Sequence, residues 1–340
     1  MYRFFDFLRF DQVPDKPVGE LPWHYPYGLL EKIWLVVWAL IGLTGAVYRE
    51  HIAASTELFG VSIAVIALVL ILPQITIRLN QAAYGAGRIV VSVVSSWATY
   101  ERSAQFLEAF RSTSYEMEML LADRLLFGGN PSEWTEVLIN PVLTEYLQLT
   151  YVSYFPMMLL VALALFFARK NRVLFRYLLA MNLAMVSCHF FYILVPVRSP
   201  FLIADDPQYA SLISYSIPLQ GLWWTEHLRQ NLLDATVMRY DCFPSGHTMH
   251  SMLAIYFGWK TNRAVRAIVT VVGVSIIFST IYLRYHYAID LVAGAGFAVF
   301  WIWASAKMTA ASWNDEPTPQ PQLSQKVASV LQHFSGNRPD

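Results

Sequence analysis

Long runs of apolar residues limit the possible folds of this chain more than any other feature of its sequence. In lipid, backbone polar groups must pair within their own segment, so such runs form helices. We predict seven spans, at residues 33–48, 59–77, 147–168, 174–195, 247–259, 265–283 and 287–307. Residues 84–100 are predicted to form either an eighth span or a helix at the membrane surface. The predicted fold is therefore an all-α, polytopic membrane helical bundle of seven or eight transmembrane helices.

The composition agrees with this fold and excludes several other classes of protein. Of 340 residues, 56% are hydrophobic and 14% are charged, and 24 basic residues balance 24 acidic ones. An average soluble domain carries about 25% charged residues. A disordered chain, a nucleic-acid binder that relies on net positive charge, and a disulfide-stapled secreted domain are all excluded. We expect Cys188 and Cys242 to be unpaired thiols.

Four segments follow from the distribution of polar residues. Residues 1–32 are predicted to be an N-terminal interfacial segment, and residues 33–145 to hold N-terminal membrane helices and an amphipathic linker. That linker should break at Gly128–Pro131. Residues 146–310 are predicted to form the catalytic membrane core, and residues 311–340 a polar C-terminal tail.

Basic residues in two short links indicate how the spans are oriented. The link at 169–176 contains four basic residues and no acidic one, and the link at 260–266 contains three and no acidic one. Because basic residues collect on the cytoplasmic side, we predict that both links are cytoplasmic. The loop at 196–246 mixes both signs of charge. This loop and the turn at 284–286 should then face the periplasm, the exterior or an organelle lumen.

Polar side chains gather at the outer ends of these predicted spans. Ionisable groups at helix ends in a membrane bundle are costly and usually mark a functional site. The side chains lie in three motifs, VPVRSP, CFPSGHTMH and YLRYHYAIDLVAG, which contain Arg198, then Ser245, Gly246 and His247, then His286 and Asp290. All three motifs fall on the same predicted face of the membrane, which favours a single site.

The chemistry of these residues suits phosphoryl transfer. His286 and Asp290 are four residues apart, so the carboxylate can accept a hydrogen bond from one ring nitrogen and leave the other to attack phosphorus. His247 begins a predicted helix and can protonate the leaving oxygen. Ser245 and the backbone at Gly246 would bind phosphate at the helix N-terminus. Arg198 would bind the equatorial oxygens.

Several nearby residues allow other interpretations. His250 lies one turn after His247 and could complete a metal site with His286 and Asp290, but a supporting hydrogen bond or simple packing is expected instead. Ser279 could donate to phosphate or bond its own helix backbone. Tyr282 could orient side chains of the site. A transporter or a non-catalytic scaffold also remains an alternative, since transporters hold charged groups near broken helices.

The three motifs together resemble those of the type-2 phosphatidic acid phosphatase superfamily, over roughly residues 145–305. The resemblance implies a six-helix phosphatase-like core, no metal and no cofactor. It assigns the nucleophile to His286, its partner carboxylate to Asp290 and the acid to His247. It also assigns phosphate binding to Ser245, Gly246 and Arg198, although the family's lysine before this arginine has no counterpart here.

Departures from the common phosphatase pattern point to a subgroup. The Ser-Arg pair seven and six residues before the nucleophile is replaced by Ser279 and Thr280. Arg284 could supply the missing charge. The stretches FSTIYLRYHYAIDLVAG and LLFGGNPSEW resemble inositol phosphorylceramide synthases, which move a phosphorylated headgroup between lipids, whereas the glycine of PSGHT is typical of the phosphatases.

The charge of the substrate distinguishes the two reactions. A phosphodiester carries one negative charge and a phosphate monoester nearly two, so a site with fewer cations suits a diester. We therefore predict a lipid headgroup transferase that uses a phospholipid donor and a lipid hydroxyl acceptor, in sphingolipid or related lipid metabolism. The alternative is a lipid phosphate phosphatase, acting on phosphatidic acid or a polyprenyl diphosphate with water as acceptor.

Overall fold

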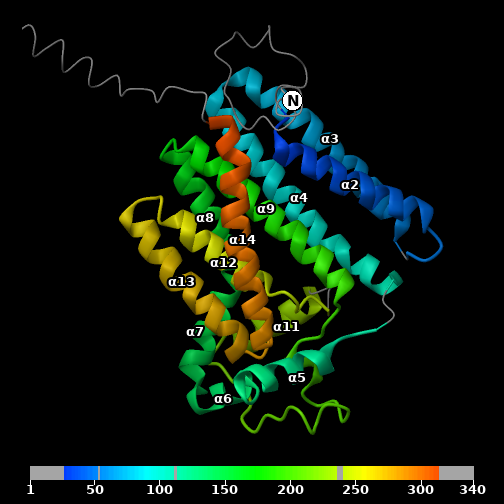
Figure 1. The fold of residues 1–340 in the computed structure, drawn as a ribbon, viewed down its shortest axis with the longest axis vertical. Coiled ribbons are helices and arrows are strands. Elements are labelled where there is room, and N and C mark those ends of the chain that lie inside the picture. Colours follow the sequence, from blue (N-terminus) through cyan, green and yellow to red (C-terminus); the bar gives the residue numbers. More distant parts are fainter. Residues whose placement is uncertain (1–26, 53, 111–112, 236–239, 314–340) are drawn as a thin grey trace, which may run out of the picture.

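The described part of the chain is a bundle of helices (Figure 1). The structure, a computed structural model, describes residues 27–313 except 53, 111–112 and 236–239. Within these ranges there is no strand, only one isolated bridge between Val197 and Asp241. The helices are α2 (Leu29–Val47), α3 (Ser55–Leu79), α4 (Gln81–Phe110), α5 (Glu116–Phe127), α6 (Pro131–Trp134), η2 (Thr135–Leu138), α7 (Pro141–Val152), α8 (Tyr154–Phe167), α9 (Asn171–Leu194), α10 (Pro200–Ile203), α11 (Thr225–Ala235), α12 (Gly246–Gly258), α13 (Arg263–Tyr282) and α14 (Ala288–Trp313).

Helix α9 lies at the centre of the bundle. In its most apolar stretch 61% of the residues are buried, against 28–33% in the other long apolar helices. It packs against α4, α8, α12 and α14 (Figure 1). The largest apolar core joins side chains of α9 to those of the surrounding long helices. Because lipid tails are as apolar as these side chains, close packing rather than exclusion of water holds such helices together.

The prediction of an all-α, polytopic membrane bundle is confirmed. Five helices are long and apolar enough to cross a membrane, namely α2, α3, α9, α13 and α14. The bent pair α7 and α8 brings the number to six; the sequence predicts one continuous span there, but the helix breaks at Ser153 and bends by 53°. The predicted count of seven or eight also includes α12, which has 13 residues, and α4, which has 30 but does not meet the same criteria.

Helix α4 carries a charge inside the bundle, and a neighbouring helix neutralises it. Arg88 on α4 bonds both carboxylate oxygens of Glu31 on α2, at 2.7 and 2.8 Å, and both side chains are buried. The Arg88 guanidinium also lies 4.6 Å from the centre of the Phe175 ring on α9. This ion pair links the N-terminal helices to the centre of the bundle, because an unpaired buried charge would be strongly destabilising.

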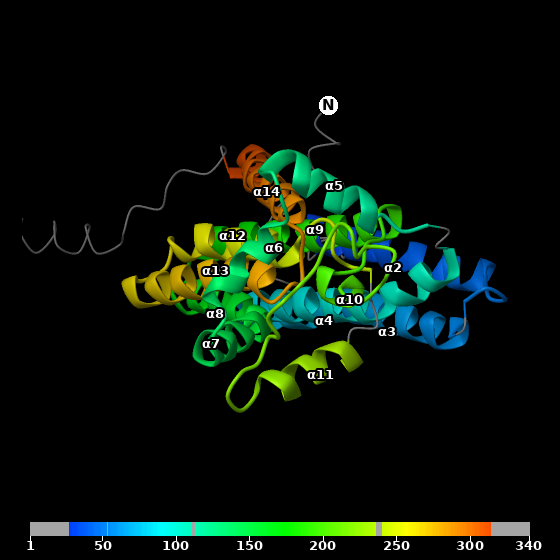
Figure 2. The same cartoon turned by 90° about the horizontal axis from the view of Figure 1, so that it is seen from below.

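The two ends of the bundle differ in character. The α8–α9 and α12–α13 turns meet at one end, where Lys170 Nζ donates to the carbonyl oxygen of Lys260 at 2.7 Å. We call this the basic end. Figure 1 shows the short helices α5, α6 and α11 at the opposite end, which we call the site end. Seen from below, α5 and α11 lie on opposite sides of the site end (Figure 2).

The predicted links agree with this arrangement of ends. Both predicted basic links lie at the basic end, while the described parts of the loop at 196–246 and the turn at 284–286 lie at the site end (Figure 1). The linker also breaks where predicted, since α5 ends at Phe127 and Gly128 adopts a φ of 82°. Most of the predicted interfacial segment 1–32 and nearly all of the tail 311–340 fall outside the described residues. The four-segment division therefore stays a prediction.

Candidate active site

The turn between α13 and α14 presents His286 at the site end of the bundle. Helix α13 ends at Tyr282, and the backbone N–H groups of Tyr285 and His286 both donate to the carbonyl oxygen of Thr280, at 2.9 and 3.0 Å. Arg284 within this turn adopts a φ of 66°, in the left-handed region. Non-glycine residues rarely adopt that conformation, and it tends to persist where the surroundings demand it. The backbone that leads into His286 is therefore held tightly.

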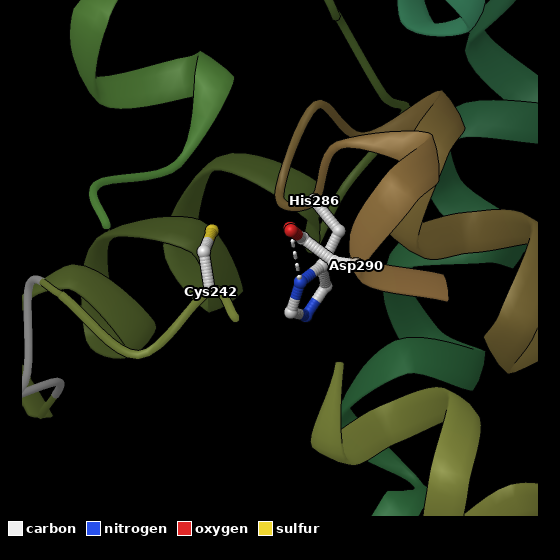
Figure 3. A group of neighbouring side chains, drawn as sticks. All are labelled: Cys242, His286 and Asp290. Atoms are coloured by element: carbon white, nitrogen blue, oxygen red, sulfur yellow. Dashed lines mark hydrogen bonds and ion pairs between the residues drawn. The ribbon is translucent and has the colours of Figure 1, made fainter. Parts of the chain in front are cut away.

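His286 and Asp290 form the pair that the sequence predicts. The His286 Nδ1 lies 3.3 Å from Asp290 Oδ2, and the same oxygen accepts the backbone N–H of Tyr287 at 3.0 Å. Figure 3 shows the second ring nitrogen on the far side of the imidazole from this carboxylate. A carboxylate that accepts from Nδ1 keeps the proton on that nitrogen and leaves a lone pair on Nε2. Nε2 is thus the nitrogen suited to attack an electrophile.

His247 lies beside this pair, at the N-terminus of α12. Its ring stacks on Tyr151 with centroids 4.2 Å apart and contacts Tyr154 at 4.4 Å. The rings of His247 and His286 have centroids 5.9 Å apart. Both side chains line the same cavity.

The predicted helix N-terminus at the PSGH motif is present. Ser245 is the N-cap of α12, and its Oγ accepts the backbone N–H of Thr248 at 3.2 Å. Gly246 also has a packing role, which the sequence does not indicate. A Cβ atom there would lie 2.9 Å from the Tyr192 hydroxyl, so glycine lets α12 pack against α9.

Contacts between α12 and α14 join the two histidines, and the sequence gives no signal for them. The backbone N–H of Ser245 donates to the carbonyl oxygen of Asp290 at 3.0 Å. One turn later, a Cβ atom on Gly294 would lie 2.5 Å from the carbonyl oxygen of Ser245. This approach is closer than any side chain permits. It fixes the start of α12, and with it His247, against the first turn of α14.

A cavity of about 270 Å³ opens onto both histidines. Helix α11 covers part of it through Leu232 and Leu233. Helix α11 is itself held in place by Glu145 on α7, whose carboxylate accepts the backbone N–H of Thr225 and three others before it. The described lining residues are Trp97, Tyr100, Tyr151, Val152, Tyr154, Phe155, Met185, Cys188, His189, Tyr192, Ser199, Phe201, Leu202, Leu232, Leu233, Asp241, Gly246, His247, His250, Tyr285 and His286.

Arg198, the predicted phosphate ligand, is held by acidic residues. Its Nε donates to Glu116 Oε1 at 2.9 Å, and Nη2 lies 3.6 Å from Asp206. The guanidinium also lies 5.9 Å from the centre of the Tyr209 ring. Burial raises the pKa of Glu116, but hydrogen bonds from Arg198 and others outweigh this and leave the pKa below its ordinary value. Arg198 is near the turn that carries His286, because its carbonyl oxygen accepts the Tyr287 hydroxyl at 3.0 Å.

Arg284 does not reach the position that the sequence suggests. Its Nη2 donates to Glu136 Oε1 at 2.9 Å and to the carbonyl oxygen of Ile217 at 2.6 Å, and the guanidinium lies 3.8 Å from the centre of the Tyr215 ring. These partners come from η2 and from the loop before α11. The left-handed φ of Arg284 turns its side chain toward them, and it is not among the described residues that line the cavity.

The three residues predicted to support the site have structural partners. His250 contacts the Tyr154 hydroxyl and the Gly246 carbonyl oxygen through Nδ1, at 2.7 and 2.8 Å, and the Met181 carbonyl oxygen through Nε2 at 3.3 Å. The Ser279 hydroxyl donates to its own helix, to the carbonyl oxygen of Ile276 at 2.7 Å. The Tyr282 hydroxyl bonds Thr144 at 2.9 Å and so joins α13 to α7.

Cys242 lies against the His286–Asp290 pair, which the sequence does not indicate. The potential ligand atoms of Cys242, His286 and Asp290 all lie within 4.8 Å of one another (Figure 3), a donor set that could hold a metal ion, and His250 is not part of it. The Cys242 thiol donates to the Tyr285 carbonyl oxygen at 3.0 Å. Burial, with the nearby charges of Asp290 and Asp241, raises the pKa of this thiol well above its ordinary value. Both cysteines are free, as predicted, and both are buried.

Asp123 on α5 supports the site from outside the predicted set. Its two carboxylate oxygens accept the backbone N–H groups of Ala288 and Ile289, each at 2.8 Å. These are free N–H groups of the first turn of α14, next to His286, where a negative charge is favourable. Burial raises the pKa of Asp123 to about 6, with a further contribution from Asp290, although both backbone hydrogen bonds oppose this. Sequence spacing could not reveal a cap from a helix more than 160 residues away.

Comparison with known proteins shows what the chain as a whole is similar to. A family profile described as the PAP2 superfamily matches residues 117–304, more than half of the chain. A PA-phosphatase related-family protein of Dictyostelium discoideum is 29% identical over 86 residues, which is 25% of this chain. The match spans only 16% of the length of that relative. No solved structure matches the chain.

Proposed function

The chain belongs to the PAP2 superfamily, and on that premise we propose that it transfers a phosphorylated headgroup from a phospholipid to a lipid hydroxyl. The proposal covers the donor and the acceptor as well as the residues that act on them. It also includes a place in the inositol phosphorylceramide synthase subgroup, supported by the stretch FSTIYLRYHYAIDLVAG. The site would face away from the cytoplasm, at the site end of the bundle.

In the first half-reaction, His286 Nε2 attacks the phosphorus of the donor. A nitrogen–phosphorus bond forms, and the bond from phosphorus to the diacylglycerol oxygen breaks. His247 gives its proton to that oxygen, so that diacylglycerol leaves as a neutral alcohol. Asp290 keeps the proton on His286 Nδ1 and stabilises the positive charge that develops on the ring. The headgroup phosphate stays on His286 as a phosphohistidine.

The second half-reaction reverses these roles. His247, now neutral, removes the proton from the acceptor hydroxyl as its oxygen attacks phosphorus. The nitrogen–phosphorus bond breaks and its electron pair returns to Nε2. The phosphodiester product forms, and both histidines regain their starting protonation. During both steps, Ser245 and the free N–H groups of the first turn of α12 would stabilise negative charge on phosphate oxygens.

One observation carries the choice of a diester substrate. None of the described residues that line the cavity is Lys or Arg, and Asp241 is acidic. Arg198 is instead paired with Glu116 and Asp206, and Arg284 is paired with Glu136. A cavity with so little positive charge suits a singly charged phosphodiester better than a monoester with nearly two negative charges.

Hydrolysis of a lipid phosphate monoester is the second candidate. The Dictyostelium relative is named as related to PA-phosphatases, and the motif PSGHT retains the glycine common in phosphatases. In this reaction water, activated by His247, would take the phosphoryl group from His286. The same residues serve both reactions, so that the acceptor and the charge of the donor decide between them.

The test follows the phosphorus atom. Purified protein in EDTA is incubated with a headgroup-labelled phospholipid or with a labelled lipid phosphate monoester, each with and without a lipid alcohol. We expect a new labelled phospholipid from the diester only when the alcohol is present, and none with His286→Ala. Free phosphate from the monoester, with or without the alcohol, would establish the phosphatase and overturn the charge argument. Inhibition by EDTA that zinc reverses would instead favour a metal at Cys242, His286 and Asp290.

A further inference from the structure

We propose that a second, apolar cavity between α4, α8 and α9 binds one hydrocarbon chain of the lipid substrate. We call it the chain groove. The proposal rests on the proposed function, since it requires a phosphate group between His247 and His286. It adds a binding site for the part of the substrate that takes no part in the chemistry, and it assigns a role to the N-terminal helices.

The chain groove has the size and lining of a hydrocarbon site. Its volume is about 360 Å³, within the range of about 300–1,000 Å³ that is usual for small-molecule pockets. Most of its lining side chains are aliphatic or aromatic. They are Ile89, Ser92, Val93, Ser96, Trp97, Phe155, Pro156, Met158, Leu159, Ala162, Tyr177, Leu178, Met181, Asn182, Met185 and His250.

The polar groups of Asn182, Ser92 and Ser96 in this lining are hydrogen-bonded within the protein. Asn182 Oδ1 accepts from Trp34 Nε1 at 2.9 Å and from the Ser96 hydroxyl at 3.0 Å. The Asn182 amide group donates to the Ser92 hydroxyl and to the Leu178 carbonyl oxygen. A buried polar group that already has its hydrogen-bond partners within the protein does not need a polar ligand. The groove therefore suits a hydrocarbon chain better than a sugar or a phosphate.

The chain groove adjoins the catalytic cavity. Four residues line both spaces, namely Trp97, Phe155, Met185 and His250. The Trp97 and Phe155 rings meet edge to face with centroids 5.2 Å apart. A chain in the groove would thus reach the cavity that contains His247, the proposed acid for the leaving lipid oxygen. This shared border is the reason to assign the groove to a substrate chain and not to bulk lipid.

The groove also opens toward the surrounding lipid. Val93 on α4 is 49% exposed and Leu159 on α8 is 40% exposed, and both line it. One wall comes from α4, which lies before residues 117–304 that match the family. The α4 side of the groove therefore comes from outside the segment that matches the family. A lipid could move from the bilayer between α4 and α8 without leaving an apolar environment.

Paired substitutions test the groove with matched controls. Val93→Trp and Leu159→Trp place a large ring in the groove. Val94→Trp and Leu163→Trp add the same ring to the same helices at exposed positions that do not line it. We expect the groove variants to lower kcat/KM for a dipalmitoyl donor by about tenfold or more relative to their controls. All four variants should turn over a dihexanoyl donor equally, because short chains do not need the groove.

The outcome separates this proposal from the proposed function. Equal kcat/KM for the dipalmitoyl donor in groove and control variants would overturn the chain groove while leaving the chemistry intact. Failure of the unmodified protein on both donors would instead contradict the proposed function. Binding can then be followed alone, with a phospholipid that carries a photoreactive chain. Crosslinks on α4, α8 and α9 that excess unlabelled phospholipid removes would support the groove, and crosslinks spread over all exposed helices would overturn it.

Discussion

Asp290 is bonded to His286 through one oxygen, and this geometry predicts a graded effect of its removal. Asp290→Asn keeps an oxygen that can accept from His286 Nδ1 or from the Tyr287 N–H, but loses the negative charge. We expect turnover to fall by roughly 100-fold, the upper end of the loss seen when the partner that orients a metal-bound histidine is changed. His286→Ala should abolish turnover and the acid-labile phosphoenzyme. Full activity of Asp290→Asn, in protein that elutes normally in detergent, would contradict the orienting role.

His247 is predicted to protonate the leaving oxygen, so the effect of substituting it on turnover should depend on the leaving group. A diacylglycerol alkoxide cannot leave readily without a proton, whereas p-nitrophenolate can. We expect His247→Ala to remove nearly all turnover of a phospholipid and to retain formation of the phosphoenzyme from a p-nitrophenyl phosphodiester. Rapid-quench measurement of the phosphoenzyme and of released p-nitrophenol checks this. An equal loss with both donors would show that His247 does not act as the acid.

Asp123 should make stability depend on pH. Its pKa is raised to about 6 in the folded protein, against about 3.9 in an unfolded chain. The folded state therefore holds this proton more firmly, and the contribution to stability falls as pH rises from about 4 to about 6. We expect the thermal midpoint of the native protein in detergent to fall across this window relative to Asp123→Asn. A constant difference between the two proteins from pH 4 to pH 7 would contradict it.

Residues whose partners are near in sequence could be predicted, and those with distant partners could not. The His286–Asp290 pair follows from a spacing of four residues, and the start of α12 follows from the motif PSGH. Arg284 was expected at the phosphate, but Glu136, which is 148 residues away, holds it elsewhere. No local pattern encodes such a partner. For the same reason, the capping role of Asp123 and the position of Cys242 emerge only from the fold.

At the scale of elements, the contact between α12 and α14 depends on one glycine. A Cβ on Gly294 would lie 2.5 Å from the Ser245 carbonyl oxygen, whereas a Cβ on Gly296 would meet nothing within 4 Å. Gly294→Ala should therefore displace the start of α12 and lower turnover by about tenfold or more, because small misplacements of reacting groups are costly. Gly296→Ala on the same helix should retain full turnover. Equal turnover of both variants with the phospholipid donor would contradict this account.

The helices of the bundle could be predicted more reliably than the bends in them and the contacts between them. Apolar runs predict each of the described long apolar helices, because in lipid such a run must pair its backbone polar groups within itself and so forms a helix. The bend at Ser153 could not be predicted, since residues on both sides of it are apolar. The place of α4 was also open, because Arg88 interrupts its apolar run. Only the pairing of Arg88 with Glu31 on α2 shows how that charge is buried inside the bundle.

At the scale of the whole molecule, the two ends of the bundle should face opposite sides of the membrane. The basic links predict that the basic end is cytoplasmic, and the proposed chemistry would then take place on the other side. Two positions are suited to report this in a Cys188→Ala, Cys242→Ser background. Arg172 lies near the basic end and is partly exposed, and Trp223, which is 81% exposed, lies at the site end.

Labelling of single cysteines at these positions would test the orientation. In sealed vesicles whose cytoplasmic face is outward, we expect an impermeant maleimide to label Arg172→Cys at once and Trp223→Cys only after detergent is added. The reverse pattern would place the site end in the cytoplasm, and labelling of both cysteines before detergent would show that the two ends share one side. If the expected pattern holds, an acceptor lipid must cross to the leaflet on the side of the site end before it can react. Turnover in such vesicles should therefore be slower than in detergent for an acceptor added from the cytoplasmic side.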